Sequence, residues 1–212
     1  MTSEALRCLA EADPVMGRLI RKIGACTLEP EPQRTPFESL VRAVAHQQLH
    51  GKAAETILGR FLTRFPGRRF PRPEDLDAVT DADLRSCGFS GSKVAALRDI
   101  AAKALDGTVP TSRKIRALPD EEIIERLSAC RGVGRWTVEM LLIFKLGRPD
   151  VLPIDDFGVR EGFRVTYGHE AQPKPRALLA FGERWRPHRT TAAWYLWRAA
   201  DAAKEASRVP KS

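Results

Sequence analysis

The sequence predicts an all-α protein, and three observations support this fold class. Hydrophobic residues recur at intervals of three and four over most of the 212-residue chain, which is the spacing of one helix face. Proline and glycine interrupt this pattern at short, regular intervals. No segment alternates β-branched or aromatic residues with polar ones, as a strand does. We therefore expect about eight to ten short helices.

The apolar pattern locates the helices in chain order. The spacing predicts helices over residues 37–48, 53–62, 122–127, 136–146 and 190–206. Breaks are expected at the proline and glycine clusters, which are Pro30–Pro36, Pro66–Gly67, Pro71–Pro73, Gly107–Pro110, Gly147–Pro149, Pro173–Pro175 and Pro187. Trp185 and Trp194 are assigned to the core, because a tryptophan at helical spacing usually packs inside.

The composition excludes several classes of protein. Hydrophobic residues make up 43% and charged residues 29% of the chain, which is a globular composition with enough apolar material for a core. The longest apolar run, Met140–Phe144, is far shorter than a membrane span. Residues 1–11 include acidic side chains and no leucine-rich block, so they do not form a secretory signal. We expect a cytoplasmic protein without membrane association.

The charge predicts a polyanionic partner. The 35 basic and 27 acidic residues give a formal net charge of +8, which favours binding to a polyanion. Residues 157–212 contain 11 basic and 5 acidic residues, and residues 60–72 contain five arginines and no acid. We expect these arginines to form one basic face. The alternative is an ordinary solvated surface.

The cysteines and histidines do not predict a metal centre. Cys8, Cys26, Cys87 and Cys130 lie far apart and none pairs at CxxC spacing, which argues against zinc and against an iron–sulfur cluster. We expect four reduced thiols in or near the core. His46 and His50 are one helical turn apart, and metal binding by this pair is a minor alternative.

Residues 127–142 predict a DNA-binding hairpin. An amphipathic helix ends near Ala129, a tight turn contains Gly132, Val133 and Gly134, and a second helix begins near Arg135. The two glycines allow a positive φ and close approach of a partner. The first amides of the second helix have no intrahelical acceptor and present a phosphate site, beside which Arg135 adds a cation. The alternative is a purely structural turn.

Asp155 and Asp156 are a second candidate site. They follow Pro153, which favours an extended approach, and precede a helix indicated by Phe157, Arg160 and Phe163. An aspartate at a helix N-terminus is stabilised as the anion by the free amides and the helix dipole. Capping needs only one carboxylate, so the other is available to face a cleft as a fixed negative charge.

With these residues in view, the chain resembles the helix-hairpin-helix/Gly-Pro-Asp superfamily of base-excision DNA glycosylases. Within it, the chain is most similar to the DNA-3-methyladenine glycosylase II (AlkA-like) family, in a compact form without the N-terminal β domain. The resemblance spans about residues 37 to 200. It rests on Gly132–Thr137, Asp155–Phe157, Arg184–Arg189 with Trp194–Trp197, Ala45–Leu49 with Lys52–Ala54, and Gly88–Phe89 with Lys93–Ala95.

The resemblance implies a monofunctional DNA glycosylase of base excision repair. Such an enzyme flips an alkylated purine, of the 3-methyladenine or 7-methylguanine type, out of double-stranded DNA and leaves an abasic site. Asp156 is then the catalytic carboxylate. Trp136 stands where related bifunctional enzymes have a lysine nucleophile, so no lyase activity is expected. The implied base pocket consists of Trp136, Met140, Phe157 and Trp197; Met140 replaces an aromatic residue found in some members.

The resemblance also implies how the chain contacts DNA. Gln48, with Leu49 as its apolar neighbour, is the candidate wedge that fills the gap left by the flipped base. Gly132, Val133, Gly134, Arg135 and Thr137 are the implied phosphate-binding residues. No cofactor is required, although a structural Na⁺ or K⁺ ion at the hairpin is implied through the backbone carbonyls of Ser128, Cys130 and Val133.

The implied architecture is a compact two-lobed helical bundle with the active-site cleft between the lobes. Residues 1–36 are expected to pack with the C-terminal helices, 37–150 to form the lobe that ends in the hairpin, 151–207 to carry the catalytic aspartate, and 208–212 to be a frayed tail. We expect a monomeric bacterial protein that is associated with the nucleoid when bound to DNA. Two alternatives stay open: a glycosylase for deaminated or oxidised purines, and a non-catalytic DNA-binding module.

Overall fold

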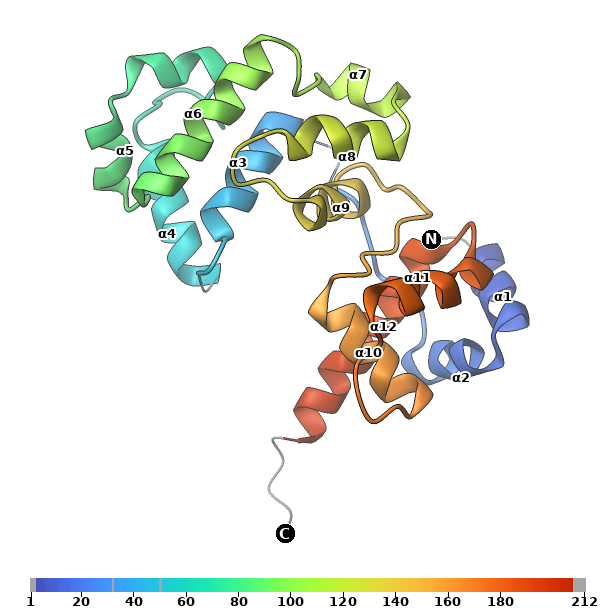
Figure 1. Ribbon diagram of the computed structural model, residues 1–212. Helices are drawn as coiled ribbons and strands as arrows, with labels where there is room; N and C mark the ends of the chain where they lie inside the picture. Colours follow the sequence, from blue (N-terminus) through green and yellow to red (C-terminus); the bar gives the residue numbers. More distant parts are fainter. Residues whose placement is uncertain (1–2, 32, 50, 208–212) are drawn as a thin grey trace. The chain divides into compact units, whose positions relative to one another are not determined.

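Residues 3–31, 33–49 and 51–207 are described by the computed structural model, and helices account for all their regular secondary structure (Figure 1). The all-α class expected from the sequence is therefore confirmed. These residues form twelve α-helices and two short 3-10 helices, more than expected. The number was underestimated because α5 (Asp81–Cys87) and α7 (Ser112–Ala117) are too short to show a helical repeat. The predicted frayed tail lies outside the described residues.

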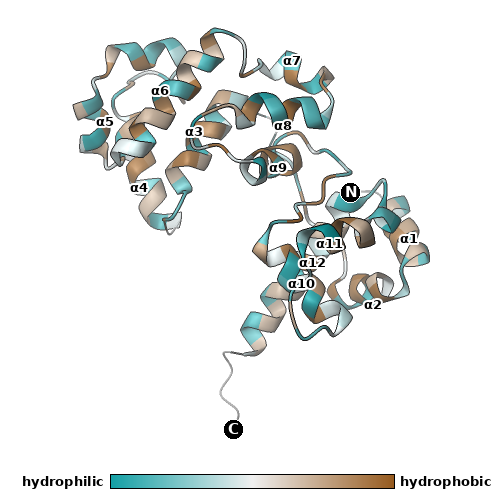
Figure 2. Cartoon of the chain, in the orientation of Figure 1, coloured by the Kyte–Doolittle hydropathy of each residue, from teal (hydrophilic) through white to brown (hydrophobic). Residues whose placement is uncertain are grey.

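The chain divides into two compact units. The central unit comprises residues 31–141, and the terminal unit comprises residues 1–30 together with 142–212. Along the described part of the chain no helix combines the length and apolar character of a membrane span. Figure 2 shows hydrophilic residues along the helices of both units, as expected of helices with one face in water.

The central unit is built around α3 (Pro36–His46). This helix packs against α4 (Gly51–Leu62) and α6 (Gly91–Leu105), and the 3-10 helix η1 (Pro73–Ala78) lies on α6. Leu40 and Val44 of α3 are buried together with Leu58, Phe61 and Leu97 of the neighbouring helices. Further along the chain, α8 (Asp120–Ser128) and α9 (Arg135–Phe144) flank the predicted hairpin turn.

The terminal unit joins the two ends of the chain. It contains α1 (Ser3–Ala12), α2 (Pro14–Ile23), α10 (Phe157–Tyr167), α11 (Pro175–Gly182), η2 (Glu183–Trp185) and α12 (Arg189–Ala206). α1 packs against α2, η2 and α12, and α2 contacts α10 and α12. Trp185 and Trp194 are buried, so their assignment to the core is confirmed.

The helices α10 and α12 cross at very close range (Figure 1). At Gly162 of α10, an added Cβ atom would lie 1.9 Å from the backbone oxygen of Leu196 in α12. Only a residue without a side chain allows this separation of the two backbones. The crossing brings the N-terminus of α10 next to the middle of α12, where Trp197 lies.

Asp13 is a buried carboxylate that connects distant parts of the terminal unit. It caps α2 by accepting hydrogen bonds from the amides of Val15 and Met16. Its Oδ2 also accepts the Tyr167 hydroxyl at 2.6 Å and the Trp185 indole N–H at 3.0 Å. Burial by itself raises the pKa of this carboxyl, but these hydrogen bonds outweigh burial and hold the pKa of Asp13 below its ordinary value.

We predict that Asp13→Ala lowers the free energy of unfolding by about 3 kcal/mol at neutral pH, because it removes a helix cap and leaves two buried donors without an acceptor. Urea denaturation measures this loss. Because the folded-state pKa is depressed, the stabilisation is present above the ordinary carboxyl pKa and disappears as the pH falls through the lowered value. The difference in the free energy of unfolding between wild type and Asp13→Ala should therefore shrink as the pH falls through the lowered pKa. Asp77→Ala, at an exposed position of η1, is the control and should leave stability nearly unchanged.

Candidate functional site

The predicted hairpin is present between α8 and α9. Gly132 adopts φ +75°, whereas Gly134 has no positive φ, so only the first of the two glycines is used as predicted. Val133 is buried between them, and its amide donates to the Cys130 carbonyl at 3.1 Å. The Val138 amide donates to the Gly134 carbonyl, so the N-terminal end of α9 follows the turn directly. This end of a helix favours an anion.

The hairpin turn is fixed from α6. The Arg131 amide donates to a carboxylate oxygen of Asp99 at 2.7 Å, and the Lys103 ammonium group bonds the same carboxylate. Burial raises the pKa of Asp99, but the hydrogen bonds from Lys103 and from the Arg131 amide outweigh it and hold that pKa below its ordinary value. The turn is therefore anchored by a charge-assisted hydrogen bond rather than by apolar packing alone.

The structure gives Arg135 a different role from the predicted one. Its guanidinium pairs with Glu121 at 2.8 Å and with the buried Glu139 at 3.0 Å. Two carboxylates already compensate the charge, so Arg135 joins α8 to α9, and a phosphate contact by this residue stays a prediction. Thr137, also predicted to contact DNA, is buried in α9.

The implied cation site has the chemistry of a monovalent ion site. Na⁺ and K⁺ are hard ions that bind oxygen, and Ser128, Cys130 and Val133 each have a backbone carbonyl oxygen to offer. The Cys130 carbonyl also accepts the Val133 amide. The hydroxyl of Ser128 is buried without a hydrogen-bond partner, so its oxygen is available as a further ligand for a cation. Burial raises the pKa of the Cys130 thiol to about 11, so this thiol is neutral at physiological pH.

The predicted wedge lies directly after α3. Gln48 adopts φ +56°, and it is the only non-glycine residue in the described chain with a positive φ. Gln48 and Leu49 are exposed. Gln47, which the sequence analysis did not single out, donates from its side-chain amide to the Gly132 carbonyl at 2.7 Å. The contact spans 85 positions in sequence, so no local pattern could have identified it.

Asp156 is held at the N-terminus of α10. Its Oδ1 accepts the Val159 amide at 2.8 Å and the Trp197 indole N–H at 2.8 Å. The capping aspartate is therefore the predicted catalytic residue itself, while Asp155 is exposed. Gly158 makes this geometry possible, because an added Cβ atom would lie 2.8 Å from the Trp197 ring. The sequence analysis did not single out Gly158. The available signal was the position of this glycine in the first turn of the predicted helix.

Aromatic side chains surround this carboxylate in the terminal unit. Trp197 stacks on Phe144, with ring centroids 5.6 Å apart and an interplanar angle of 24°. Phe144 is 41% exposed and Phe157 is 72% exposed. Such exposure of large apolar rings is typical of binding surfaces. Phe144 was not predicted as a site residue, because its place at the end of an apolar helix indicated packing.

The other predicted site residues belong to the central unit. Trp136 in the first turn of α9 is 47% exposed, and Met140 one turn later is half-buried. The structure therefore brings together Asp156, Phe157 and Trp197 in one unit. In the other unit it brings together the predicted wedge and the hairpin turn.

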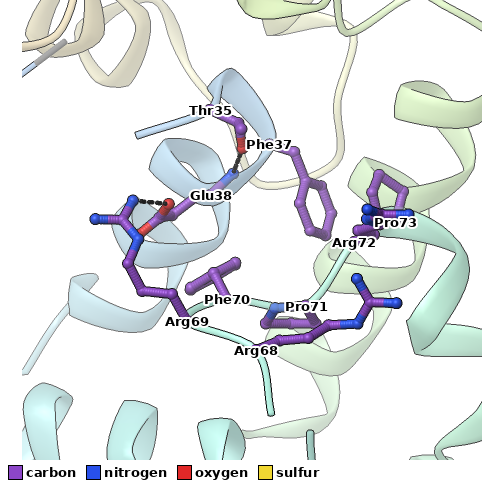
Figure 3. Close-up of a pocket in the computed structure, with 9 residues that line it drawn as sticks. All are labelled: Thr35, Phe37, Glu38, Arg68, Arg69, Phe70, Pro71, Arg72 and Pro73. Atoms are coloured by element: carbon purple, nitrogen blue, oxygen red, sulfur yellow. Dashed lines mark hydrogen bonds and ion pairs between the residues drawn. The ribbon is translucent and has the colours of Figure 1, made fainter. Parts of the chain in front are cut away.

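Three of the five arginines of residues 60–72, Arg64, Arg68 and Arg69, pair with carboxylates, and the basic face expected from the sequence stays a prediction. Arg69 pairs with the buried Glu38, and Arg68 pairs with Asp75. Figure 3 shows Arg69 directed toward Glu38 and Arg68 extending past Pro71. They line a cavity of about 330 Å³ with Thr35, Phe37, Glu38, Phe70, Pro71, Arg72 and Pro73. This cavity is at the N-terminal end of α3, whereas the wedge follows its C-terminal end.

The arginines of residues 184–189 are also engaged within the protein. Arg189 is buried and bonds Asp150 at 2.8 Å, and Arg186 pairs with Asp150 and Glu183. Arg189 therefore has little exposed surface left for a phosphate contact. A buried guanidinium is retained here because it neutralises a carboxylate and fixes the start of α12.

The thiols agree with the sequence analysis. All four cysteines are free, and Cys87 and Cys130 are buried. Within residues 3–31, 33–49 and 51–207, no three His, Cys, Asp or Glu side chains are grouped as a metal site. His46 bonds Glu55 at 3.1 Å, and His50 lies outside the described residues.

The chain matches one family model over most of its length and is similar to known DNA repair proteins. Residues 41–187 match the model of the HhH-GPD superfamily of base excision DNA repair proteins. The chain is 44% identical over 171 residues to DNA-3-methyladenine glycosylase 1 of Schizosaccharomyces pombe, covering 81% of this chain and 75% of the relative.

Two solved structures are similar over nearly the whole chain. A 3-methyladenine DNA glycosylase of S. pombe in complex with abasic DNA has a TM-score of 0.81 and 41% identity, over 92% of this chain and 96% of the other. A DNA-3-methyladenine glycosidase of Bacillus halodurans has a TM-score of 0.87 and 33% identity, over 96% and 92%.

The two hairpin glycines should differ in their tolerance of alanine. We predict that Gly132→Ala lowers the free energy of unfolding by about 1–2 kcal/mol, because a Cβ atom is unfavourable at positive φ. Gly134→Ala should stay within about 0.5 kcal/mol of wild type, since an added Cβ meets no atom within 4 Å. Urea denaturation of both variants measures the difference. Equal stability of the two variants would contradict the assignment of the turn to Gly132.

Proposed function

Because the chain belongs to the HhH-GPD superfamily of base excision DNA repair proteins, we propose that it is a DNA glycosylase acting on alkylated bases. Its substrate is double-stranded DNA that contains purines of the 3-methyladenine or 7-methylguanine type. It hydrolyses the N-glycosidic bond and leaves an abasic site. The relatives named as 3-methyladenine glycosylases support the reaction and the substrate class.

The observation that carries this proposal is the fixed carboxylate of Asp156. A carboxylate that caps a helix and accepts an indole N–H keeps one orientation. An anion fixed in this way is suited to stabilise positive charge that develops beside it.

The reaction needs little assistance at the leaving base. An alkylated purine carries a positive charge, so it takes the electron pair of its bond to C1′ and departs as a neutral molecule. The sugar passes through an oxocarbenium-like state, which the Asp156 carboxylate stabilises. The oxygen of a water molecule then bonds to C1′, and the carboxylate accepts the proton that the water loses.

The base must leave the helical stack before this chemistry can occur. We assign Phe157 and Trp197, which belong to the same unit as Asp156, to the binding of the extruded base. A contribution by Trp136 and Met140 of the other unit stays a prediction from the sequence. A cationic purine is attracted to electron-rich rings, each contributing about 0.5–2 kcal/mol. Phe144, which stacks on Trp197, holds that ring in place. Gln48 and Leu49 fill the space that the base leaves.

DNA binding is assigned to the hairpin. The positive end of the α9 dipole attracts a phosphate, and Gly132, Val133 and Gly134 let the DNA backbone approach. A Na⁺ or K⁺ ion would be held by the carbonyls of Ser128, Cys130 and Val133, and it would supply positive charge next to the phosphate. These contacts fix the DNA and carry no sequence information.

We predict that Asp156→Asn lowers the single-turnover rate of 7-methylguanine release by roughly a thousandfold or more. The amide retains an oxygen that can cap α10 and accept the Trp197 N–H, so folding and DNA binding should be preserved. Chromatography of released bases and a binding titration with abasic-site DNA measure both properties. Asp155→Asn is the matched control, because Asp155 is the exposed neighbour. Substantial base release by Asp156→Asn, or an equal loss in both variants, would refute the assignment.

We also predict that the product is an intact strand with an abasic site. Trp136 follows the hairpin turn and has no nucleophilic amine, so no Schiff base can form at this position. Borohydride treatment during turnover should trap no covalent protein–DNA complex, and strand scission should require added alkali. A glycosylase with a lysine nucleophile serves as the positive control. Accumulation of a trapped complex would assign a lyase activity to the protein.

A further inference from the structure

The C-terminus of α3 is capped by a lysine from another helix. Lys93, in the first turn of α6, donates from its ammonium group to the carbonyls of Ala45 and Gln47, at 2.8 Å each. The last carbonyls of a helix have no intrahelical donor and carry partial negative charge, so a cation is favoured there. Burial lowers the pKa of Lys93, and the two carbonyls are the hydrogen-bond acceptors of this partly buried ammonium group.

The backbone of the predicted wedge begins at this cap. Gln47 ends α3, its carbonyl is bound by Lys93, and Gln48 follows in the left-handed region at φ +56°. A non-glycine residue persists in this region only when its surroundings determine the conformation. The turn leaves Gln48 and Leu49 exposed.

Gln47 also connects the wedge to the hairpin. The Gln47 side-chain amide donates to the Gly132 carbonyl at 2.7 Å. Gly132 also lies against α6, because an added Cβ atom there would be 3.4 Å from the Cβ of Ala96. The end of α3, the start of α6 and the hairpin turn thus meet in one place within the central unit.

From these contacts, we propose that Lys93 and Gln47 are positioning residues that hold the wedge, Gln48 and Leu49, in a fixed position relative to the hairpin turn at Gly132. The inference rests on the proposed glycosylase function. Neither residue takes part in bond cleavage. Their effect is on base extrusion, because a wedge fixed relative to the phosphate-binding turn enters the duplex without a separate ordering step.

The proposal predicts a loss that depends on base pairing. Extrusion is easiest for a base that is unpaired and poorly stacked. Lys93→Met keeps the length of the side chain and removes its charge and donors. It should slow 7-methylguanine release about tenfold when the lesion faces cytosine, but no more than about threefold when it faces an abasic-site analogue. Single-turnover rates are measured on the two duplexes with enzyme in excess. The quantity compared between variants is the rate for the lesion opposite the abasic-site analogue divided by the rate for the lesion opposite cytosine.

One control variant and a second test variant make this comparison decisive. Lys114→Met removes one exposed lysine of α7 in the same unit and should slow neither reaction by more than about twofold, because it changes only the general attraction to DNA. Gln47→Met breaks the other half of the connection and should change the ratio in the same direction as Lys93→Met. It also provides the test if Lys93→Met fails to fold, as judged by circular dichroism and thermal unfolding.

The outcomes separate this inference from the proposed function. The positioning role is supported if the ratio of the unpaired-lesion rate to the paired-lesion rate rises in Lys93→Met or Gln47→Met and keeps its wild-type value in Lys114→Met. An equal slowing on both duplexes, or no slowing, overturns it, because a loss of stability or of catalysis acts on paired and unpaired lesions alike. Failure of the wild-type protein to release 7-methylguanine from either duplex would refute the proposed function instead.

Discussion

The close crossing of α10 and α12 is the constraint on which the candidate carboxylate site depends. Because Gly162 has no side chain, the backbones approach until a Cβ atom would overlap the Leu196 oxygen. At that separation the Trp197 indole reaches Asp156 and donates to it. The Val159 amide donates to the same oxygen. Packing between two helices, rather than a flexible loop, therefore orients the carboxylate and the ring that stacks beside it.

Part of the positive charge in this protein is used within the fold. Several arginines that the sequence singles out pair with carboxylates, among them Arg69 with Glu38, Arg135 with Glu121 and Arg189 with Asp150. The attraction for DNA therefore depends on helix dipoles and backbone amides at the hairpin as well as on net charge. A surplus of basic residues in the sequence indicates the class of partner but does not locate the interface, because pairing depends on tertiary contacts.

The fold class and part of the site follow from local sequence, and the rest depends on long-range contacts. Helical spacing predicted the all-α fold and the burial of Trp185, and a glycine between helices predicted the turn at Gly132. The sequence could not show that Gln47 bonds the hairpin or that Asp13 receives donors from Tyr167 and Trp185. These partners are 85 to 172 positions apart. Gly134 was assigned a positive φ because the two glycines cannot be distinguished without backbone geometry.

The discontinuity of the terminal unit has a consequence for biosynthesis. α1 and α2 are synthesised before the central unit, yet the residues that pack on this part of the chain, including Tyr167, Trp185 and α12, are synthesised after it. The central unit is contiguous in sequence and can fold while synthesis continues. For the time needed to translate well over a hundred residues, the N-terminal helices expose apolar surface without their partners. This interval is the period in which a nascent chain of this topology depends most on chaperones.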